Sequence, residues 1–273
     1  MTPPLRLASC MSELADPFGR ALSEYLGDAL RQEVIWVEDL PWQERQTLVQ
    51  KGEIEIGWMC GLDYVKTFQE GAFELLAAPV MSGARYRGTP AYFTDVVVRR
   101  ESGLATFEEM RGTRWVYNEP GSFSGYAVLL AHLLQQGEDL KYFAEAVASG
   151  AHSASVERVL AGEADGTAVD STVFDLMCSV RPGLRERLRV VKTLGPNPIP
   201  PFVVSRAVAA GVRERLREFF LQMHATPRGR EILSLALITH FVAVRDRDYD
   251  PIRQVMGTIS LSPRSDFIHT TLR

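Results

Sequence analysis

Two serines separated by one residue, Ser122 and Ser124, mark the segment of this chain that is best suited to binding an anion. The segment follows a strand-like stretch and a turn at residues 117–121, and it precedes the apolar stretch 127–136, which predicts a helix. At such a junction, the serine hydroxyls and the unpaired N–H groups of the first helical turn point into the same small volume. The simpler alternative is that one serine only caps the helix.

Two further junctions of the same kind follow in the sequence. Residues 149–156 (SGAHSASV) and residues 168–171 (AVDS) each come where an expected strand gives way to an expected helix. Such junctions can hold a small anion with backbone N–H groups and hydroxyls, without a metal or a cofactor. Three junctions together favour a ligand site over three unrelated helix caps.

The elements that must position these junctions alternate between strands and helices along the chain. This alternation predicts an α/β fold in which helices cover both faces of a sheet and ligands bind at the carboxyl ends of the strands. The expected strands are residues 5–9, 34–38, 53–59, 73–79, 91–99, 115–118, 144–149, 166–170, 188–193 and 202–205. Outside the three junctions, the expected helices are residues 13–31, 42–51, a short helix that begins at 61, 208–223 and 227–237.

Two segments are suited to carry the chain between lobes. Residues 91–99 (AYFTDVVVR) form a long strand, and the proline-rich residues 195–201 form a stiff, extended return. A discontinuous first lobe and a continuous second lobe follow from two such crossings. The predicted division is lobe 1 from residues 1–94 and 198–273, and lobe 2 from residues 95–197.

Composition restricts the class of ligand and partner. The chain has 273 residues, of which 46% are hydrophobic and 23% charged, and its net charge is −4. This charge gives no support for a broad nucleic-acid-binding face, so we expect no nucleic-acid partner. No apolar stretch approaches the roughly eighteen residues of a membrane helix, so we expect no stable membrane insertion.

The cysteines and the other reactive side chains predict neither a metal nor a cofactor. Cys10, Cys60 and Cys178 are widely spaced, which argues against a zinc site and a disulfide framework, although a Cys10–Cys60 bridge stays open. We find no nucleophile–base pair and no cofactor fingerprint, so we expect a binding protein and not an enzyme.

The first residues resemble a processing site. Residues 7–10 (LASC) match the cleavage pattern of bacterial lipoproteins, but only six residues precede them and none of these forms an apolar stretch. We therefore interpret residues 5–9 as the first strand. The expectation is a chain without an export signal as written, which is either cytoplasmic or separated from its signal.

Several motifs together resemble a known family. They are Tyr92, the stretch 101–112, the serine segment 122–126, residues 149–152, residues 156–165 and residues 168–171. In order and spacing, these motifs resemble the phosphonate-type substrate-binding proteins of ABC importers. The resemblance implies the type II periplasmic-binding-protein fold, a two-lobed clamp in which each lobe is a mixed sheet flanked by helices.

The resemblance also implies a function. Family members capture a small oxyanion, usually phosphonate, phosphite or phosphate, between the lobes without chemistry. It implies an ABC permease as partner, a periplasmic location and a monomer. The alternative is a cytoplasmic enzyme on the same fold, a lyase or synthase of cofactor biosynthesis acting on a small carboxylate or phosphate-bearing substrate. The sequence offers no catalytic residues for that alternative.

The resemblance assigns roles to residues of the second lobe. The hydroxyls of Ser122 and Ser124 and the N–H groups of Phe123 and Gly125 would cradle the anionic oxygens. A hydroxyl residue usually stands at position 123, so Phe123 removes one donor and makes the wall apolar.

Two more second-lobe residues and three first-lobe residues complete the expected site. Tyr92 and His152 would donate from the sides, and Asp170 would accept from a protonated oxygen or an amino group of the ligand. The alternative role of Asp170 is to cap the next helix. Cys10 and Trp58 lie in the expected first-lobe loops, which differ from the usual family loops and allow a larger or more apolar ligand.

Overall fold

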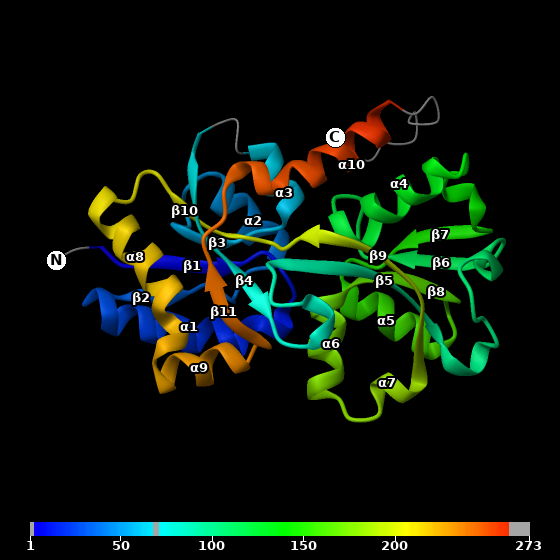
Figure 1. The fold of residues 1–273 in the computed structure, drawn as a ribbon, viewed down its shortest axis with the longest axis horizontal. Helices are drawn as coiled ribbons and strands as arrows, with labels where there is room; N and C mark the ends of the chain where they lie inside the picture. The colour runs from blue at the N-terminus through cyan, green and yellow to red at the C-terminus, as the bar shows by residue number, and fades with distance from the viewer. Residues whose placement is uncertain (1–2, 68–70, 262–273) are drawn as a thin grey trace. The chain divides into compact units, whose positions relative to one another are not determined.

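Two compact units make up the protein. The computed structural model describes residues 3–67 and 71–261. One unit comprises the described residues of Met1–Ala91 and Pro198–Tyr249, and the other comprises those of Tyr92–Asn197 and Asp250–Arg273. The chain therefore passes from one unit to the other three times, and the colour gradient of Figure 1 follows these passages.

The first unit is built on a six-stranded mixed sheet with the order β11-β4-β10-β3-β1-β2. Strand β1 is parallel to β2 and β3, whereas β10 is antiparallel to β3 and β4, and β11 is antiparallel to β4. The strands are β1 (Leu5–Ser9), β2 (Val34–Trp36), β3 (Ile56–Trp58), β4 (Phe73–Met81), β10 (Phe202–Ser205) and β11 (Ile238–Val242). The helices are α1 (Asp16–Leu30), α2 (Trp42–Gln50), α3 (Gly61–Thr67), α8 (Ala210–Gln222) and α9 (Pro227–Ser234).

Helix α1 shows why this unit forms a core. Its apolar residues Phe18, Leu22 and Leu26 recur every four positions, so they share one face of the helix. All three are at most 1% exposed. Pro17 stands in the first turn, where no intrahelical hydrogen bond needs its missing N–H group.

The second unit is built on a five-stranded sheet with the order β7-β6-β8-β5-β9. Strands β7, β6 and β8 are parallel neighbours, and β5 is antiparallel to β8. The strands are β5 (Ala91–Arg99), β6 (Arg114–Tyr117), β7 (Glu145–Ala148), β8 (Gly166–Asp170) and β9 (Leu188–Pro198). The helices are the π-helix η6 (Phe123–Ala127), α4 (Val128–Gln135), α5 (His152–Ala161), α6 (Ser171–Val180), α7 (Leu184–Arg187) and α10 (Asp250–Ser260).

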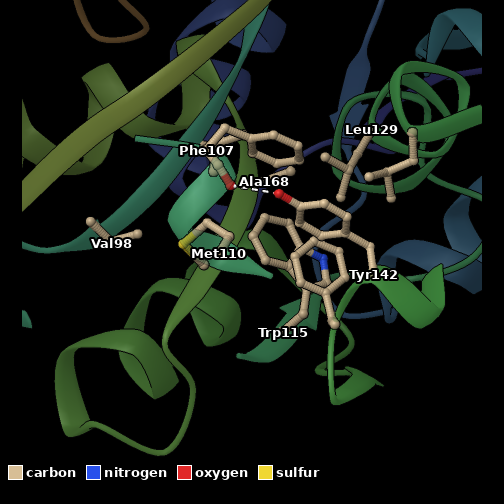
Figure 2. Close-up of a cluster of buried hydrophobic side chains, with 10 residues drawn as sticks. Val98, Phe107, Met110, Trp115, Leu129, Tyr142 and Ala168 are labelled. Atoms are coloured by element: carbon tan, nitrogen blue, oxygen red, sulfur yellow. Dashed lines mark hydrogen bonds between the residues drawn. The ribbon is translucent and has the colours of Figure 1, made fainter. Parts of the chain in front are cut away.

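Stacked aromatic rings form the centre of the second unit (Figure 2). The ring of Trp115 lies 4.5 Å from that of Phe143, and the ring of Phe107 lies 5.4 Å from that of Tyr142. The hydroxyl of Tyr142 donates to the backbone oxygen of Phe107 at 3.1 Å. The buried phenol therefore has a partner, and the rings can pack without leaving its polar atom unsatisfied.

The expected fold class is confirmed: both units are mixed sheets flanked by helices. The division at the C-terminus differs from the expectation that residues 198–273 form one lobe. Helix α10 groups with the second unit, where it contacts α4 and η6, and its buried residues Ile252 and Ile259 give it an apolar face. The part of that expectation that concerns residues 262–273 lies outside the described residues.

Two smaller features were not expected. The helix expected over residues 227–237 ends at Ser234, and strand β11 follows it. Leu237 adopts a positive φ of 56°, which ends the helical path without a glycine or a proline to signal it.

Within residues 3–67 and 71–261, no helix could cross a membrane, and no group of three potential ligand side chains could hold a metal ion. No disulfide joins Cys10 to Cys60.

Candidate ligand-binding site

The three junctions singled out from the sequence lie side by side at one edge of the second sheet. Strands β7, β6 and β8 are parallel and adjacent, with Tyr117 of β6 opposite Ala148 of β7 and Val116 opposite Thr167 of β8. Their carboxyl ends therefore meet at the same edge, which is where parallel sheets place ligands. Helices η6, α5 and α6 begin at this edge.

Ser122 is the N-cap of the π-helix η6. Its backbone is extended, and its hydroxyl oxygen accepts the N–H of Gly125 at 3.0 Å. The N–H of Gly125 is thus already engaged, which differs from its expected role as an anion donor. The N–H groups of Phe123 and Ser124 have no acceptor in the described part of the chain. These two donors therefore stay available at the positive end of the helix formed by η6 and α4.

Ser124 and His152 bring two junctions together. The hydroxyl oxygen of Ser124 lies 3.2 Å from Nε2 of His152, at hydrogen-bond distance. Burial of the imidazole lowers the pKa of His152 to about 4. The ring is therefore neutral at pH 7 and acts as a dipole, not as a cation.

The other ring nitrogen, Nδ1, is buried and has no hydrogen-bond partner in the described residues. A neutral imidazole carries a proton on one nitrogen and a lone pair on the other. If Nδ1 carried the proton, this buried donor would have no acceptor. The lower-energy arrangement therefore places the proton on Nε2, where the hydroxyl oxygen of Ser124 accepts it.

Gly125 and Asn118 are packed so closely that no side chain fits between them. A Cβ atom at position 125 would lie 1.9 Å from Oδ1 of Asn118 and 3.0 Å from Cε1 of His152. Oδ1 of Asn118 is buried and has no donor among the described residues. Gly125 thus allows the serine segment, the Asn118 amide and the imidazole to converge.

Asp170 acts as the N-cap of α6. Its carboxylate accepts the backbone N–H and the hydroxyl of Thr172, both at 2.7 Å. This is the capping role that the sequence left open beside ligand binding. Burial raises the pKa of Asp170 to about 6, although the bonds from Thr172 act in the opposite direction.

Tyr92 and Phe123 have buried side chains. Tyr92 lies in β5 and is 2% exposed, while its neighbour Phe93 donates its N–H to the hydroxyl of Ser171 at 2.9 Å. The side chain of Phe123 is 1% exposed, so its ring is buried. Its backbone N–H belongs to the first turn of η6, where it has no intrahelical acceptor.

Cys10 and Trp58 belong to the first unit and are mostly buried there. The N–H of Cys10 donates to the carbonyl of Trp58 at 2.9 Å, and burial raises the pKa of the Cys10 thiol well above its usual range. The indole N–H of Trp58 donates to the carbonyl of Pro200 at 3.1 Å, and its ring stacks on Phe202 at 5.2 Å. Both residues therefore have structural contacts within the first unit.

The structure thus brings together four of the expected site residues: Ser122, Ser124, Gly125 and His152. Sequence reasoning missed Asn118, which it interpreted only as the end of a strand. The available signal was its position: a polar residue at the end of a buried strand, directly before the serine segment. Its role depends on the close approach to Gly125, which no sequence pattern shows.

Comparison with known proteins identifies the fold and the family. The sequence family described as ABC transporter, phosphonate, periplasmic substrate-binding protein matches residues 9–249. A binding-protein component of an ABC phosphonate transporter from Pseudomonas aeruginosa is 17% identical, with a TM-score of 0.83, over 97% of this chain and 90% of that chain.

Two other solved structures share the fold at similar distance in sequence. PhnD1 from Prochlorococcus marinus, in complex with methylphosphonate, is 16% identical, with a TM-score of 0.80, over 94% of this chain and 98% of that chain. XAC2383 from Xanthomonas citri, bound to ATP, is 16% identical, with a TM-score of 0.73, over the full length of both chains. At this level of identity the structural matches establish the fold alone.

Proposed function

The chain belongs to the family of periplasmic substrate-binding proteins of phosphonate ABC transporters, and we propose that it captures a small oxyanion of the phosphonate, phosphite or phosphate type. Members of this family are substrate-binding transport proteins, so the enzyme alternative is not favoured. The family implies a small-molecule ligand and a membrane permease as partners.

The observation that carries the proposal is the convergence of donors at the start of η6. The N–H groups of Phe123 and Ser124 and the hydroxyl of Ser122 lie at the positive end of a helix. The hydroxyl oxygen of Ser122 accepts from Gly125, which leaves its O–H available to donate. Such a set of neutral donors is suited to tetrahedral anionic oxygens.

His152 orients the second hydroxyl. With its proton on Nε2, the imidazole donates to the oxygen of Ser124, and the O–H of Ser124 is then directed to the ligand. Because the pKa of His152 is lowered to about 4, this arrangement persists through neutral pH. We propose that His152 acts through Ser124, in place of the direct donation expected from the sequence.

The remaining expected residues keep less direct roles in this proposal. Asp170 holds the start of α6 at the same edge of the sheet, and Tyr92 lies on the neighbouring strand β5. Cys10 and Trp58 support the loops of the first unit. Family members are periplasmic; for this chain we propose a periplasmic monomer that delivers its ligand to the permease.

A ligand screen tests the proposal. Freshly purified protein is unfolded in guanidinium, dialysed and refolded to remove any bound ligand, and is then titrated with methylphosphonate, phosphite, phosphate and, as a control, a neutral sugar. The expected result is a rise in melting temperature and a 1:1 complex in native mass spectrometry with at least one oxyanion. Stabilisation by none of the oxyanions would contradict the proposed function.

A further inference from the structure

A second concave site lies in the second unit, at the end of β5 that is remote from the three junctions. Thr94 of β5 pairs with Asp170, whereas Val98 pairs with Gly166 at the other end of β8. Beyond Val98 the chain opens into a pocket of about 340 Å³. The pocket is lined by Arg99, Arg100, Glu101, Leu160, Glu186 and Arg187.

The Arg99 side chain lines this pocket, where it has close packing and only a weak ion pair. Its guanidinium packs over Gly162, where a Cβ atom would lie only 3.1 Å from Nη1. Its Nε–H is buried and has no acceptor among the described residues. The nearest ion-pair partner is Glu101, at 3.7 Å, which is too long for a hydrogen bond. The side chain of Glu101 is 82% exposed, so water screens this pair.

Besides Arg99, the pocket has a second arginine whose guanidinium is available to a ligand, Arg187. Arg100 donates to the carbonyls of Glu186 and Leu188, at 2.8 and 3.0 Å, and so fixes the backbone around α7. Arg187 is exposed and has no ion pair or hydrogen bond in the part of the chain that the structure describes. Glu101 and Glu186 are exposed and oppose these cations.

A third carboxylate near Arg99 is already engaged. Asp165 binds Arg114 through both of its oxygens, at 2.8 Å to Nη2 and 3.2 Å to Nε. This pairing is the main cause of the lowered pKa of Asp165, and Arg99 contributes less. Asp165 therefore does not neutralise Arg99 to the extent that a direct partner would.

We propose that this pocket binds a small anion with two phosphate-like groups, independently of the site at η6. A planar guanidinium presents paired donors that match phosphate oxygens, and two separate arginines match two such groups. The volume of about 340 Å³ is far larger than the ~10–15 Å³ that a cavity needs to hold one water, so the pocket has room for more than a single tetrahedral ion.

Inorganic pyrophosphate is the probe that tests this site. The Nε–H resonance of Arg99, assigned with the variant Arg99→Lys, is followed by NMR during a titration at low ionic strength. We expect it to shift in a saturable way, and to shift equally in the variant Ser124→Ala, which alters only the site at η6. Arg187→Gln should weaken binding about five- to tenfold.

A charge-matched control separates a site from a general electrostatic effect. Arg181 is exposed in the same unit and pairs with Glu157, but it does not line the pocket. Arg181→Gln should leave pyrophosphate affinity unchanged. The proposal is overturned if the Arg99 resonance does not move, or if Arg181→Gln and Arg187→Gln weaken binding to the same extent.

Discussion

The hydroxyl oxygen of Ser124 lies 3.2 Å from Nε2 of His152, although the two residues are 28 positions apart in the chain. The contact exists because β6 and β7 are parallel neighbours in register, with Tyr117 opposite Ala148. The backbone pairing continues past the strands, since Ser149 donates its N–H to the carbonyl of Tyr117 at 2.8 Å. The sheet thus positions a hydroxyl and a neutral imidazole as one unit.

Ser122 should contribute to both stability and binding. Ser122→Ala removes the cap that accepts the N–H of Gly125, so the free energy of unfolding should fall by about 1 kcal/mol. The same change removes one donor and should weaken oxyanion binding. Chemical denaturation and calorimetric titration measure the two effects. Ser122→Thr retains the hydroxyl as a control, and an unchanged stability of Ser122→Ala would show that the cap does not contribute.

Gly125 should not tolerate a methyl group. In Gly125→Ala the new Cβ would lie 1.9 Å from Oδ1 of Asn118, so the amide and the serine segment must shift. We expect a loss of about 1–3 kcal/mol in unfolding free energy, together with a loss of binding. Gly121→Ala is the matched control, because its Cβ would approach no atom closer than 4.0 Å. Equal effects of the two substitutions would contradict the close packing.

His152 should make the fold less stable in acid. Its pKa is about 4 in the folded state and near 6.5 when unfolded, so between these values the unfolded chain binds more protons. Stability should therefore fall as the pH drops from 6.5 to 4, by up to about 3 kcal/mol. Denaturation curves at several pH values measure this slope, and His152→Gln should flatten it. An equally steep slope in the variant would assign the acid sensitivity to other groups.

Asp170 should act in the opposite direction within the same range. Its pKa is raised from 3.8 to about 6 by burial, so the folded state binds more protons between these values, and stability rises as the pH falls. Asp170→Asn keeps a capping oxygen but removes the buried charge. The variant should gain stability relative to the native protein at pH 7 and lose that advantage near pH 4. A difference that does not vary with pH would contradict the raised pKa.

Much of the fold is predictable from local patterns, but the contacts of the site are not. Stretches such as 91–99 and 166–170 are rich in β-branched residues, and both are strands in the structure. Strand β11 was missed because the chain leaves α9 through Leu237 with a positive φ and no glycine or proline. The unit to which α10 belongs is decided by its packing against α4, which its amphipathic pattern does not reveal.

The residues of the site can likewise be predicted from the sequence only in part. The serine segment is recognisable because its residue types match the needs of a helix N-terminus. By contrast, the neutral state of His152 and the role of Asn118 follow from burial and from the close approach to Gly125. These properties arise only when the chain folds and β6 and β7 lie side by side, so local residue patterns could not predict them.

The affinity of Ser124→Ala for the oxyanion that stabilises the native protein most is the most direct test of the central claim. A donor to a charged ligand contributes about 1.5–3 kcal/mol, so we predict a ten- to hundredfold weaker affinity by calorimetric titration. Unfolding free energy should fall by about 1–3 kcal/mol, because the buried Nε2–H of His152 loses its acceptor. Ser179→Ala, which removes a hydroxyl bonded to Leu176 in α6, is the control with unchanged affinity. If Ser124→Ala melts at a lower temperature but binds as tightly as the native protein, the serine is structural and the account of the anion site is contradicted.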